Sequence, residues 1–268
     1  MNEFNQDNLT PEMAKELSSQ YRSGQWWLDP KLAATYLAIR FPATQAVVKR
    51  VMEEAPEGAS LLDFGAGPGS DLDYPKITRV EHNPSILKIG KKRHPQDQWL
   101  TSLPDEPHDI VLASYSLGES PEMVDNLWSL AKMALIIIEP GTPSGYQNIL
   151  KFRQSIIEKG GFVKAPCPHE KKCPMANGWC HFGTKVERSQ QHRLLKEGVL
   201  GWEEEKYSFV ILVREPPERL ARILHVPKKR KGHIHVTLCE ADDIHQRIIT
   251  SKDARYKNLK KKGWGDAL

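Results

Sequence analysis

The stretch Ser60-Leu61-Leu62-Asp63-Phe64-Gly65-Ala66-Gly67-Pro68-Gly69 decides the fold, because a short apolar run leads directly into a glycine-rich loop. Glycines let the backbone turn sharply out of a strand and approach a ligand without a Cβ in the way. We therefore predict a strand over residues 60–64, a ligand-binding loop over residues 65–69 and a helix after that loop. The alternative is a glycine-rich turn that only connects two elements.

The spacing of the glycines separates two classes of cofactor. A dinucleotide-binding loop has the pattern Gly-x-Gly-x-x-Gly, whereas this loop is Gly-x-Gly-x-Gly and Ser70 stands where the third glycine would be. Glu81 ends the next apolar run, where a carboxylate can accept hydrogen bonds from both hydroxyls of a ribose. This pattern resembles class I methyltransferases and predicts S-adenosylmethionine as the cofactor. The predicted contacts from this part of the chain are Asp63, Gly65, Ala66, Gly67, Gly69 and Glu81.

The rest of the chain indicates an α/β fold. Further apolar runs at 77–81, 109–113 and 134–139 alternate with loops and helical patterns, which favours a parallel sheet covered on both faces. A helix is predicted at 144–159 and a late strand of the same sheet at 207–214. The predicted organisation is an N-terminal helical region (1–57), a Rossmann-like class I methyltransferase domain (58–218) with a Cys-rich insertion (165–184), and a basic, strand-rich C-terminal extension (219–268).

The loop after the run 109–113 is expected to border the methyl group, because ligands of this fold lie outside the carboxyl ends of the strands. Ser114 and Tyr115 are therefore predicted as further cofactor contacts. The stretch Ser114-Tyr115-Ser116-Leu117 lacks the Asn/Asp-Pro-Pro-aromatic motif of enzymes that methylate exocyclic base amines. Tyr115, Glu119 and Glu139 are weak candidates for a general base, so no catalytic residue is assigned.

Cys167, Cys173 and Cys180 lie among prolines, asparagine and glycine rather than on apolar elements, which favours metal ligands over scattered buried thiols. Zinc sites space paired ligands by two to four residues, whereas here five and six residues intervene. Iron–sulfur sites accept looser spacing and often have proline beside a cysteine. We predict a [4Fe–4S] cluster on these three cysteines and Cys239, the remaining thiol. The alternative is zinc, with His169 or His181 in place of Cys239.

Several stretches together resemble one family, the methyltransferase-like proteins of the bacterial and mitochondrial small ribosomal subunit. They are Tyr36–Thr44, Leu62–Gly69, Cys167-Pro168-His169, Trp179-Cys180-His181-Phe182 and Gly263-Trp264-Gly265-Asp266. The resemblance implies a four-cysteine iron–sulfur site on Cys167, Cys173, Cys180 and Cys239, and binding to small-subunit RNA during assembly. Two functions stand beside each other: an RNA methyltransferase, and a non-catalytic assembly factor that binds S-adenosylmethionine without transferring its methyl group.

Two basic stretches are predicted to contact that RNA. Lys228-Lys229-Arg230-Lys231 lies at a predicted hairpin turn over 228–232, and Lys260-Lys261-Lys262 lies near the end of the sequence. Clustered lysine and arginine neutralise phosphates and release counterions, which gives salt-sensitive and sequence-tolerant binding. The alternative is a solvated turn and a charged tail.

The bulk composition is compatible with these partners without requiring them. The formal net charge is +4 and 39% of the residues are hydrophobic. No run approaches the ~18 apolar residues that a membrane-spanning helix needs, so no membrane contact is expected. Residues 1–11 have neither the apolar core of a secretory signal nor the Arg-rich character of a mitochondrial presequence. We therefore expect a cytoplasmic monomer with its cysteines reduced or bound to metal.

Overall fold

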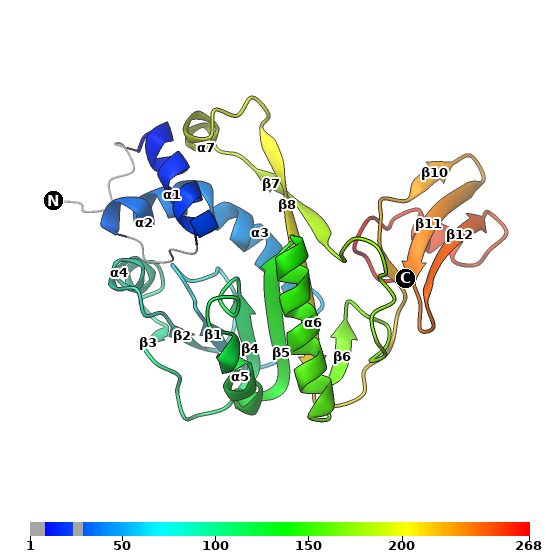
Figure 1. The fold of residues 1–268 in the computed structure, drawn as a ribbon, viewed down its shortest axis with the longest axis horizontal. Helices are drawn as coiled ribbons and strands as arrows, with labels where there is room; N and C mark the ends of the chain where they lie inside the picture. The colour runs from blue at the N-terminus through cyan, green and yellow to red at the C-terminus, as the bar shows by residue number, and fades with distance from the viewer. Residues whose placement is uncertain (1–8, 24–28) are drawn as a thin grey trace. The chain divides into compact units, whose positions relative to one another are not determined.

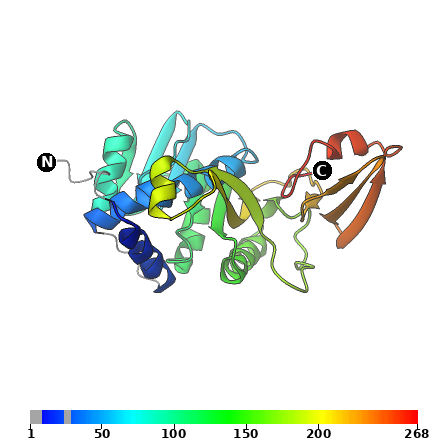
Figure 2. The same cartoon turned by 90° about the horizontal axis from the view of Figure 1, so that it is seen from above.

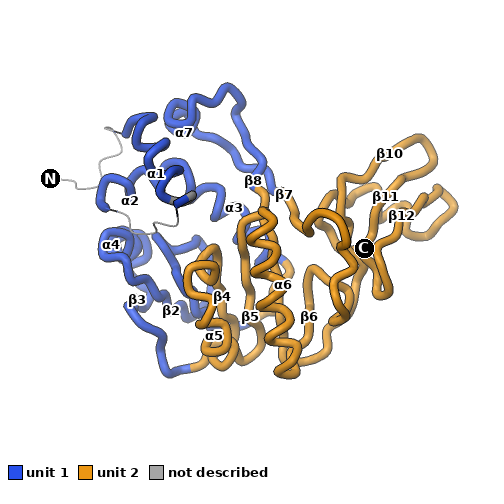
Figure 3. Tube along the Cα trace, viewed as in Figure 1, with its two compact units in different colours: residues 1–53, 58–106, 184–205 blue, residues 54–57, 107–183, 206–268 orange. Residues whose placement is uncertain are grey.

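In the computed structural model the described residues are 9–23 and 29–268, and they form two compact units (Figure 3). Unit 1 comprises residues 1–53, 58–106 and 184–205. Unit 2 comprises residues 54–57, 107–183 and 206–268. Parts of the predicted helical region, residues 1–8 and 24–28, lie outside the described residues. The predicted division at residues 57 and 218 stays a prediction.

Two helices of unit 1 begin where a short polar residue meets proline. Asp29 precedes Pro30 and its Oδ1 accepts a hydrogen bond from the Leu32 amide at 2.9 Å; Asn83 caps the helix that starts at Pro84 in the same way. Such residues satisfy free amides of the first turn, and proline fits the first helical position. The helices are α1 (Pro11–Ser23), α2 (Pro30–Ile39), α3 (Phe41–Met52), α4 (Pro84–Arg93) and α7 (Gln190–Leu195).

β1 (Ser60–Phe64) and β2 (Lys76–Val80) confirm two of the predicted runs to within one residue. The short β3 (Gln98–Leu100) was not predicted, and the three strands are parallel in the order β3-β2-β1. This order is that of the first half of a Rossmann-like sheet. The apolar faces of α1, α2, α4 and α7 form a buried cluster that includes Leu17, Leu32, Ile39, Ile89 and Leu195.

The helix predicted after the glycine loop is wrong. Residues 70–75 contain neither helix nor strand, and β2 begins at Lys76. Side chains hold this segment instead: the Asp71 amide donates to Gln45 Oε1 of α3 at 3.0 Å, and Arg93 of α4 pairs with the Asp71 carboxylate at 2.9 Å. The connection between β1 and β2 is too short, and too rich in Asp and Pro, for a helix to form within it.

Unit 2 contains β4 (His108–Ser114), β5 (Ala131–Pro140), β6 (Phe162–Ala165) and the end of the long β8 (Trp202–Val213). α5 (Val124–Leu130) and α6 (Pro143–Glu158) pack against β5, after the 3-10 turn η2 (Pro121–Met123) (Figures 1 and 2). β5 is parallel to β4, but β8 lies between β5 and β6 and is antiparallel to both. The sheet is therefore mostly parallel rather than wholly parallel as predicted. α6 returns the chain so that β6 runs in the direction of β5, and β8 is inserted between them in reverse.

β7 (Phe182–Glu187) pairs with β8. The C-terminal part of unit 2 contains a small antiparallel sheet. Its strands are β9 (Arg222–Ile223), β10 (Lys228–Arg230), β11 (His233–Cys239) and β12 (Ile244–Thr250), followed by α8 (Tyr256–Leu259). The turn predicted over 228–232 is narrower, because Arg230 already pairs with His233 and Gly232 supplies a φ of +80°. No helix among the described residues is long and apolar enough to cross a membrane.

Candidate functional site

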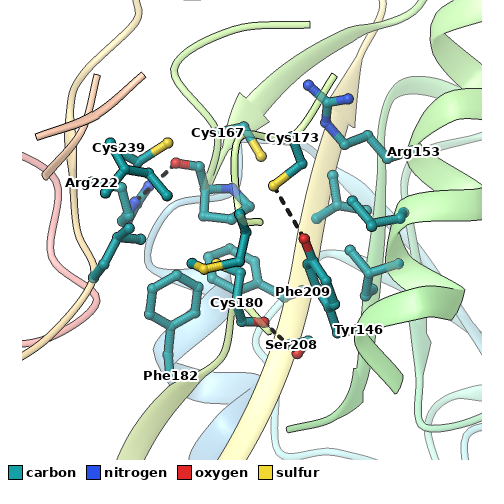
Figure 4. Close-up of a pocket in the computed structure, with 17 residues that line it drawn as sticks. Tyr146, Arg153, Cys167, Cys173, Cys180, Phe182, Ser208, Phe209, Arg222 and Cys239 are labelled. Carbon is teal, nitrogen blue, oxygen red and sulfur yellow. Dashed lines mark hydrogen bonds between the residues drawn. The ribbon is translucent and has the colours of Figure 1, made fainter. Parts of the chain in front are cut away.

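The four cysteines of the predicted metal site line one pocket of unit 2 (Figure 4). Cys167, Cys173 and Cys180 come from residues 166–181, a described segment without helix or strand between β6 and β7. Cys239 is the last residue of β11 and approaches from the small sheet. All four are free thiols. The structure thus brings together residues that are up to 72 positions apart in the sequence.

Neighbouring elements of unit 2 hold this segment through hydrogen bonds. The hydroxyl of Tyr146, in the first turn of α6, donates to Cys173 Sγ at 3.2 Å. Ser208 Oγ of β8 donates to the carbonyl of Cys180 at 2.8 Å. Phe182 and Phe209 supply apolar walls of the pocket. The thiols therefore converge on a mostly apolar space whose outline is fixed from several directions.

Two buried arginines satisfy backbone carbonyls of the same segment. Arg222 donates from Nε to Pro166 O at 3.2 Å, and Arg153 donates from Nη2 to His169 O at 2.5 Å and to Lys171 O at 3.0 Å. Both side chains are almost completely buried. A buried carbonyl without a partner is costly, so these arginines keep an otherwise irregular segment in one conformation.

The environment of Cys167, Cys180 and Cys239 opposes the ionisation of their thiols. Burial, together with the neighbouring Cys167 and Cys173, raises the pKa of Cys239 to about 12. Burial and the other three cysteines raise the pKa of Cys180 well above its ordinary value. Burial also raises the pKa of Cys167, although the guanidinium of Arg153 acts in the opposite direction. Four clustered thiolates need more positive charge than the arginines provide, which a bound metal group would supply.

The four sulfurs are spaced more widely than ligands that already surround a single metal ion. Among the described residues, no three of these sulfurs lie within 4.8 Å of one another. Thiolates bound to a single zinc at ~2.3 Å in a tetrahedron would lie about 3.8 Å apart. In a [4Fe–4S] cluster each thiolate binds a different iron, which separates the sulfurs more widely. Four cysteine sulfurs are a donor set that zinc and iron–sulfur clusters both use.

The two histidines that the zinc alternative invoked do not line this pocket. His169 is buried beside it, and burial lowers the pKa of its imidazole. His181 stacks on Trp179 with a ring separation of 5.1 Å, and its Nδ1 lies 3.1 Å from the Trp179 carbonyl oxygen. The structure describes both histidines, and neither lines the pocket as the fourth zinc ligand in place of Cys239.

The glycine loop is folded around the carboxylate of Glu81. Its Oε2 accepts a hydrogen bond from the Gly67 amide at 2.9 Å, and its Oε1 accepts one from the Asn83 amide at 2.7 Å. Gly67 has a φ of +58°, which a side chain would strain. Burial raises the pKa of Glu81. Each carboxylate oxygen keeps a second lone pair, so the predicted contact to a ribose remains chemically available.

Asp63 is engaged by Arg79, a residue that the sequence analysis did not single out. Arg79 is fully buried; its Nη1 lies 2.7 Å from Asp63 Oδ2, its Nε lies 2.7 Å from Asp97 Oδ2, and its Nη2 donates to Ser70 O at 2.9 Å. Burial raises the pKa of Asp63, and Arg79 opposes that shift. Asp63 thus supports the loop through Arg79. Its predicted contact with the cofactor, like those of Gly65, Ala66 and Gly69, stays a prediction.

Ser114 and Tyr115 lie in unit 2, where β4 ends. Tyr115 has a φ of +58°, a conformation that residues other than glycine rarely adopt and that concentrates at functional sites. The carboxylate of Glu139, a weak candidate for a general base, already accepts two hydrogen bonds. Its two oxygens accept hydrogen bonds from the Gly118 amide and from Asn148 Nδ2, each at 3.1 Å, and burial raises its pKa.

The two predicted RNA-binding stretches meet on the small sheet of unit 2. Lys229 Nζ donates to the carbonyl of Lys260 at 2.8 Å, although 31 positions separate them. Lys228 and Arg230 alternate with Lys229 along β10 and pair with the outward-facing His235 and His233. The other basic residues of these stretches, Lys231, Lys261 and Lys262, lie in the adjoining turns. Their contact with RNA stays a prediction.

Parallel strands with a glycine loop after β1, and a pocket lined by four cysteines, define the chain as a Rossmann-like methyltransferase-fold protein with a candidate metal centre. The chain belongs to the family described as mitochondrial small ribosomal subunit Rsm22, which matches residues 30–268. It is 28% identical over 293 residues to the human (Homo sapiens) ribosome assembly protein METTL17, mitochondrial, covering 88% of this chain and 62% of that protein.

A second relative is Rsm22-cox11 tandem protein 2, mitochondrial, of Schizosaccharomyces pombe, with 25% identity over 354 residues, 99% of this chain and 47% of that protein. The chain thus spans about half to two thirds of the length of these relatives. The solved magnesium protoporphyrin IX methyltransferase of Synechocystis PCC 6803 is 13% identical, with 76% of this chain and 97% of that one covered and a TM-score of 0.40.

The cytoplasmic location expected from the sequence is contradicted by these comparisons. The matching family and both relatives are described as mitochondrial. The expectation rested on the composition of residues 1–11, which says nothing about the location of the family.

Replacing Arg79 by methionine is expected to lower the free energy of unfolding by about 3–5 kcal/mol, because Asp63 would be left buried without its cation. The loss should be larger at pH 8 than at pH 5. Without Arg79, the pKa of Asp63 in the folded protein, which is already raised, rises further. The folded protein then keeps a proton on Asp63 that the unfolded protein releases, so the free energy of unfolding falls as pH rises. Urea unfolding at both pH values measures this.

The matched control is Lys76→Met, which breaks the exposed pair between Lys76 and Glu106. Exposed pairs contribute about 0–1 kcal/mol, so little change is expected at either pH. Equal effects of the two substitutions would contradict a structural role for Arg79.

Proposed function

We propose that this protein binds S-adenosylmethionine and an iron–sulfur cluster and acts on small-subunit ribosomal RNA during ribosome assembly. The observation that carries the proposal is the family match over residues 30–268, because it spans the glycine loop, the four cysteines and both basic stretches. The names of the relatives support the same partner, since METTL17 is called a ribosome assembly protein.

The methyl donor would be held by the glycine loop of unit 1. Gly67 and Gly69 bring backbone close to the ligand without side chains, and Glu81 offers its remaining lone pairs to ribose hydroxyls. S-adenosylmethionine supplies an activated methyl group on its sulfonium when bound. Ser114 and Tyr115 are proposed as contacts on grounds of their place after β4, where ligands of this fold lie.

Cys167, Cys173, Cys180 and Cys239 would hold the cluster, one thiolate on each iron. The wide spacing of the sulfurs favours this group over zinc. Residues 166–181 contain few apolar side chains that could fold the segment by burial, so cluster binding would contribute directly to its folding free energy.

A non-catalytic assembly factor remains the second candidate, and one contact favours it. Glu139, the best-buried carboxylate near the ends of β4 and β5, uses both oxygens to hold Gly118 and Asn148. General-base catalysis needs a carboxylate within hydrogen-bond reach of the proton it removes. These two hydrogen bonds give Glu139 a supporting role in the loop. The Asn/Asp-Pro-Pro-aromatic motif of enzymes that methylate exocyclic base amines is lacking after β4.

Protein purified without oxygen is expected to contain iron and acid-labile sulfide in stoichiometric amounts. Serine in place of Cys167 or Cys180 should remove most of both, because an alcohol is a poor ligand for iron–sulfur clusters. Elemental analysis and visible absorption provide the measurement. Stoichiometric zinc without iron would contradict the cluster proposal. The control is Ser129→Cys, which adds a thiol at an exposed position of α5.

Gly67→Arg is expected to weaken S-adenosylmethionine binding at least about tenfold, that is about 1.4 kcal/mol, by straining the loop and filling the ligand's space. Gly201→Arg, at an open position with an ordinary φ, is the control. Transfer of labelled methyl to immature small subunits then separates the two candidates. Label in RNA that depends on Gly67 establishes a methyltransferase, whereas cofactor and particle binding without label establishes the assembly factor.

Alanine at both Lys228 and Arg230 is expected to weaken binding to a small-subunit ribosomal RNA fragment and to flatten its salt dependence. Each lost phosphate contact should reduce the slope of log K against log salt by roughly 0.7–0.9. Filter binding over a series of salt concentrations measures the slope. Alanine at Lys91 and Lys92 of α4 is the control of equal charge, and the same slope in all three proteins would reject the contact.

A further inference from the structure

Trp179 ties the cysteine segment to the end of β5. It directly precedes Cys180, and its indole Nε1 donates to the carbonyl of Gly141 at 2.9 Å. The Gly141 amide donates to Lys206 O at 2.9 Å, and a Cβ on Gly141 would lie 2.6 Å from the backbone of Lys206 and Tyr207. The Gly141 peptide is thus held by β8 on one side and by the cysteine segment on the other.

Glu139 connects the end of β5 to the loop after β4 through a hydrogen bond. It lies two residues before Gly141, is 2% exposed, and accepts a hydrogen bond from the Gly118 amide at 3.1 Å. Tyr115 lies in the same loop with a φ of +58°, and its amide donates to Ile138 O at 2.8 Å. An unfavourable conformation of this kind persists only where the surroundings hold it. The loop over 115–118 therefore depends on the position of residues 138–141.

Two further contacts join the cysteines to the same elements. Tyr146 of α6 donates to Cys173, and Ser208 donates to the carbonyl of Cys180. Ser208 lies directly opposite Glu139 in the register of β8 on β5. Each cysteine contact thus leads to the carboxyl end of β5, which is the end of the sheet where ligands of this fold bind.

We infer that metal loading of the four-cysteine site sets the conformation of the 115–118 loop, and that Trp179 is the positioning residue through which it acts. The inference rests on the proposed function, since both the metal group and the methyl donor are proposed there. A metal that holds Cys180 fixes the adjacent indole. The indole then restrains Gly141, and the short path through Glu139 restrains Gly118 and the rest of the loop over 115–118.

Hydrogen–deuterium exchange of the full chain tests this directly. Parent and Trp179→Phe proteins are compared after depletion by a chelator and after anaerobic loading with ferrous iron and sulfide, and separately with zinc. In the parent, loading is expected to slow exchange of the Gly118 and Gly141 amides about fivefold. In Trp179→Phe, which keeps the ring and all four thiols, iron content is unchanged and the slowing at Gly118 is lost.

Binding of S-adenosylmethionine gives the second readout. Loading is expected to tighten it in the parent and not in Trp179→Phe. A purely structural role for Trp179 would shift exchange and affinity by the same factor with and without metal, and that outcome overturns the inference. Trp202→Phe, at a partly exposed position of unit 1, should respond to metal as the parent does.

The outcomes separate the inference from the proposed function. Bound metal with unchanged exchange at Gly118 in the parent overturns the inference and leaves the metal site standing. Failure of the parent to bind iron or zinc overturns both. If Trp179→Phe does not fold, the comparison of loaded and depleted parent still decides whether loading reaches Gly118.

Discussion

Arg222 is almost completely buried, and its guanidinium joins three separate parts of unit 2. It donates to Pro166 O beside the cysteines and to Gly265 O near the end of the sequence, and it forms a bidentate pair with Glu54 at 2.9 and 2.7 Å. Arginine suits this place because its planar fork presents several donors at once and stays charged. The positions of the cysteine segment and of β9 within unit 2 both depend on this one side chain.

A buried arginine also holds the backbone next to the glycine loop in unit 1. Ser70 O, in the irregular stretch after the loop, is satisfied by buried Arg79, as Pro166 O is by Arg222 and His169 O by Arg153. In each case a segment with few apolar side chains is held by a guanidinium from a neighbouring element. Both candidate sites are thereby built on backbone that is rigid without being helical or stranded.

The sequence alone predicted strands and grouped the cysteines correctly where the signal is local. Apolar runs located β1, β2, β4 and β5, and proline-rich surroundings marked Cys167, Cys173 and Cys180 as a group. It failed where partners are distant. β3 has three residues and a half-exposed pattern, and β12 alternates too weakly to stand out, so neither was predicted. The buried roles of Arg79 and Arg222 were missed because arginine in a sequence normally indicates a solvated surface.

The candidate sites show the same limit. The place of Glu81 at the end of an apolar run was predicted, but neither its hydrogen bond from the Gly67 amide nor the pairing of Asp63 with Arg79 was. The helix expected after Gly69 failed because glycine spacing alone carries no information on the length of the connection to β2. Tertiary contacts decided both cases, as they do wherever local preference is weak.

The alternation of side chains in β10 also constrains how this segment can diverge in evolution. Lys228 and Arg230 face outward and make no contact that distinguishes a lysine from an arginine, so exchange between the two would be tolerated there. Lys229 instead donates to the carbonyl of Lys260 and so joins the hairpin to the segment after α8. A substitution of Lys229 is therefore expected to disturb the hairpin, whereas exchange of lysine and arginine at positions 228 and 230 is not.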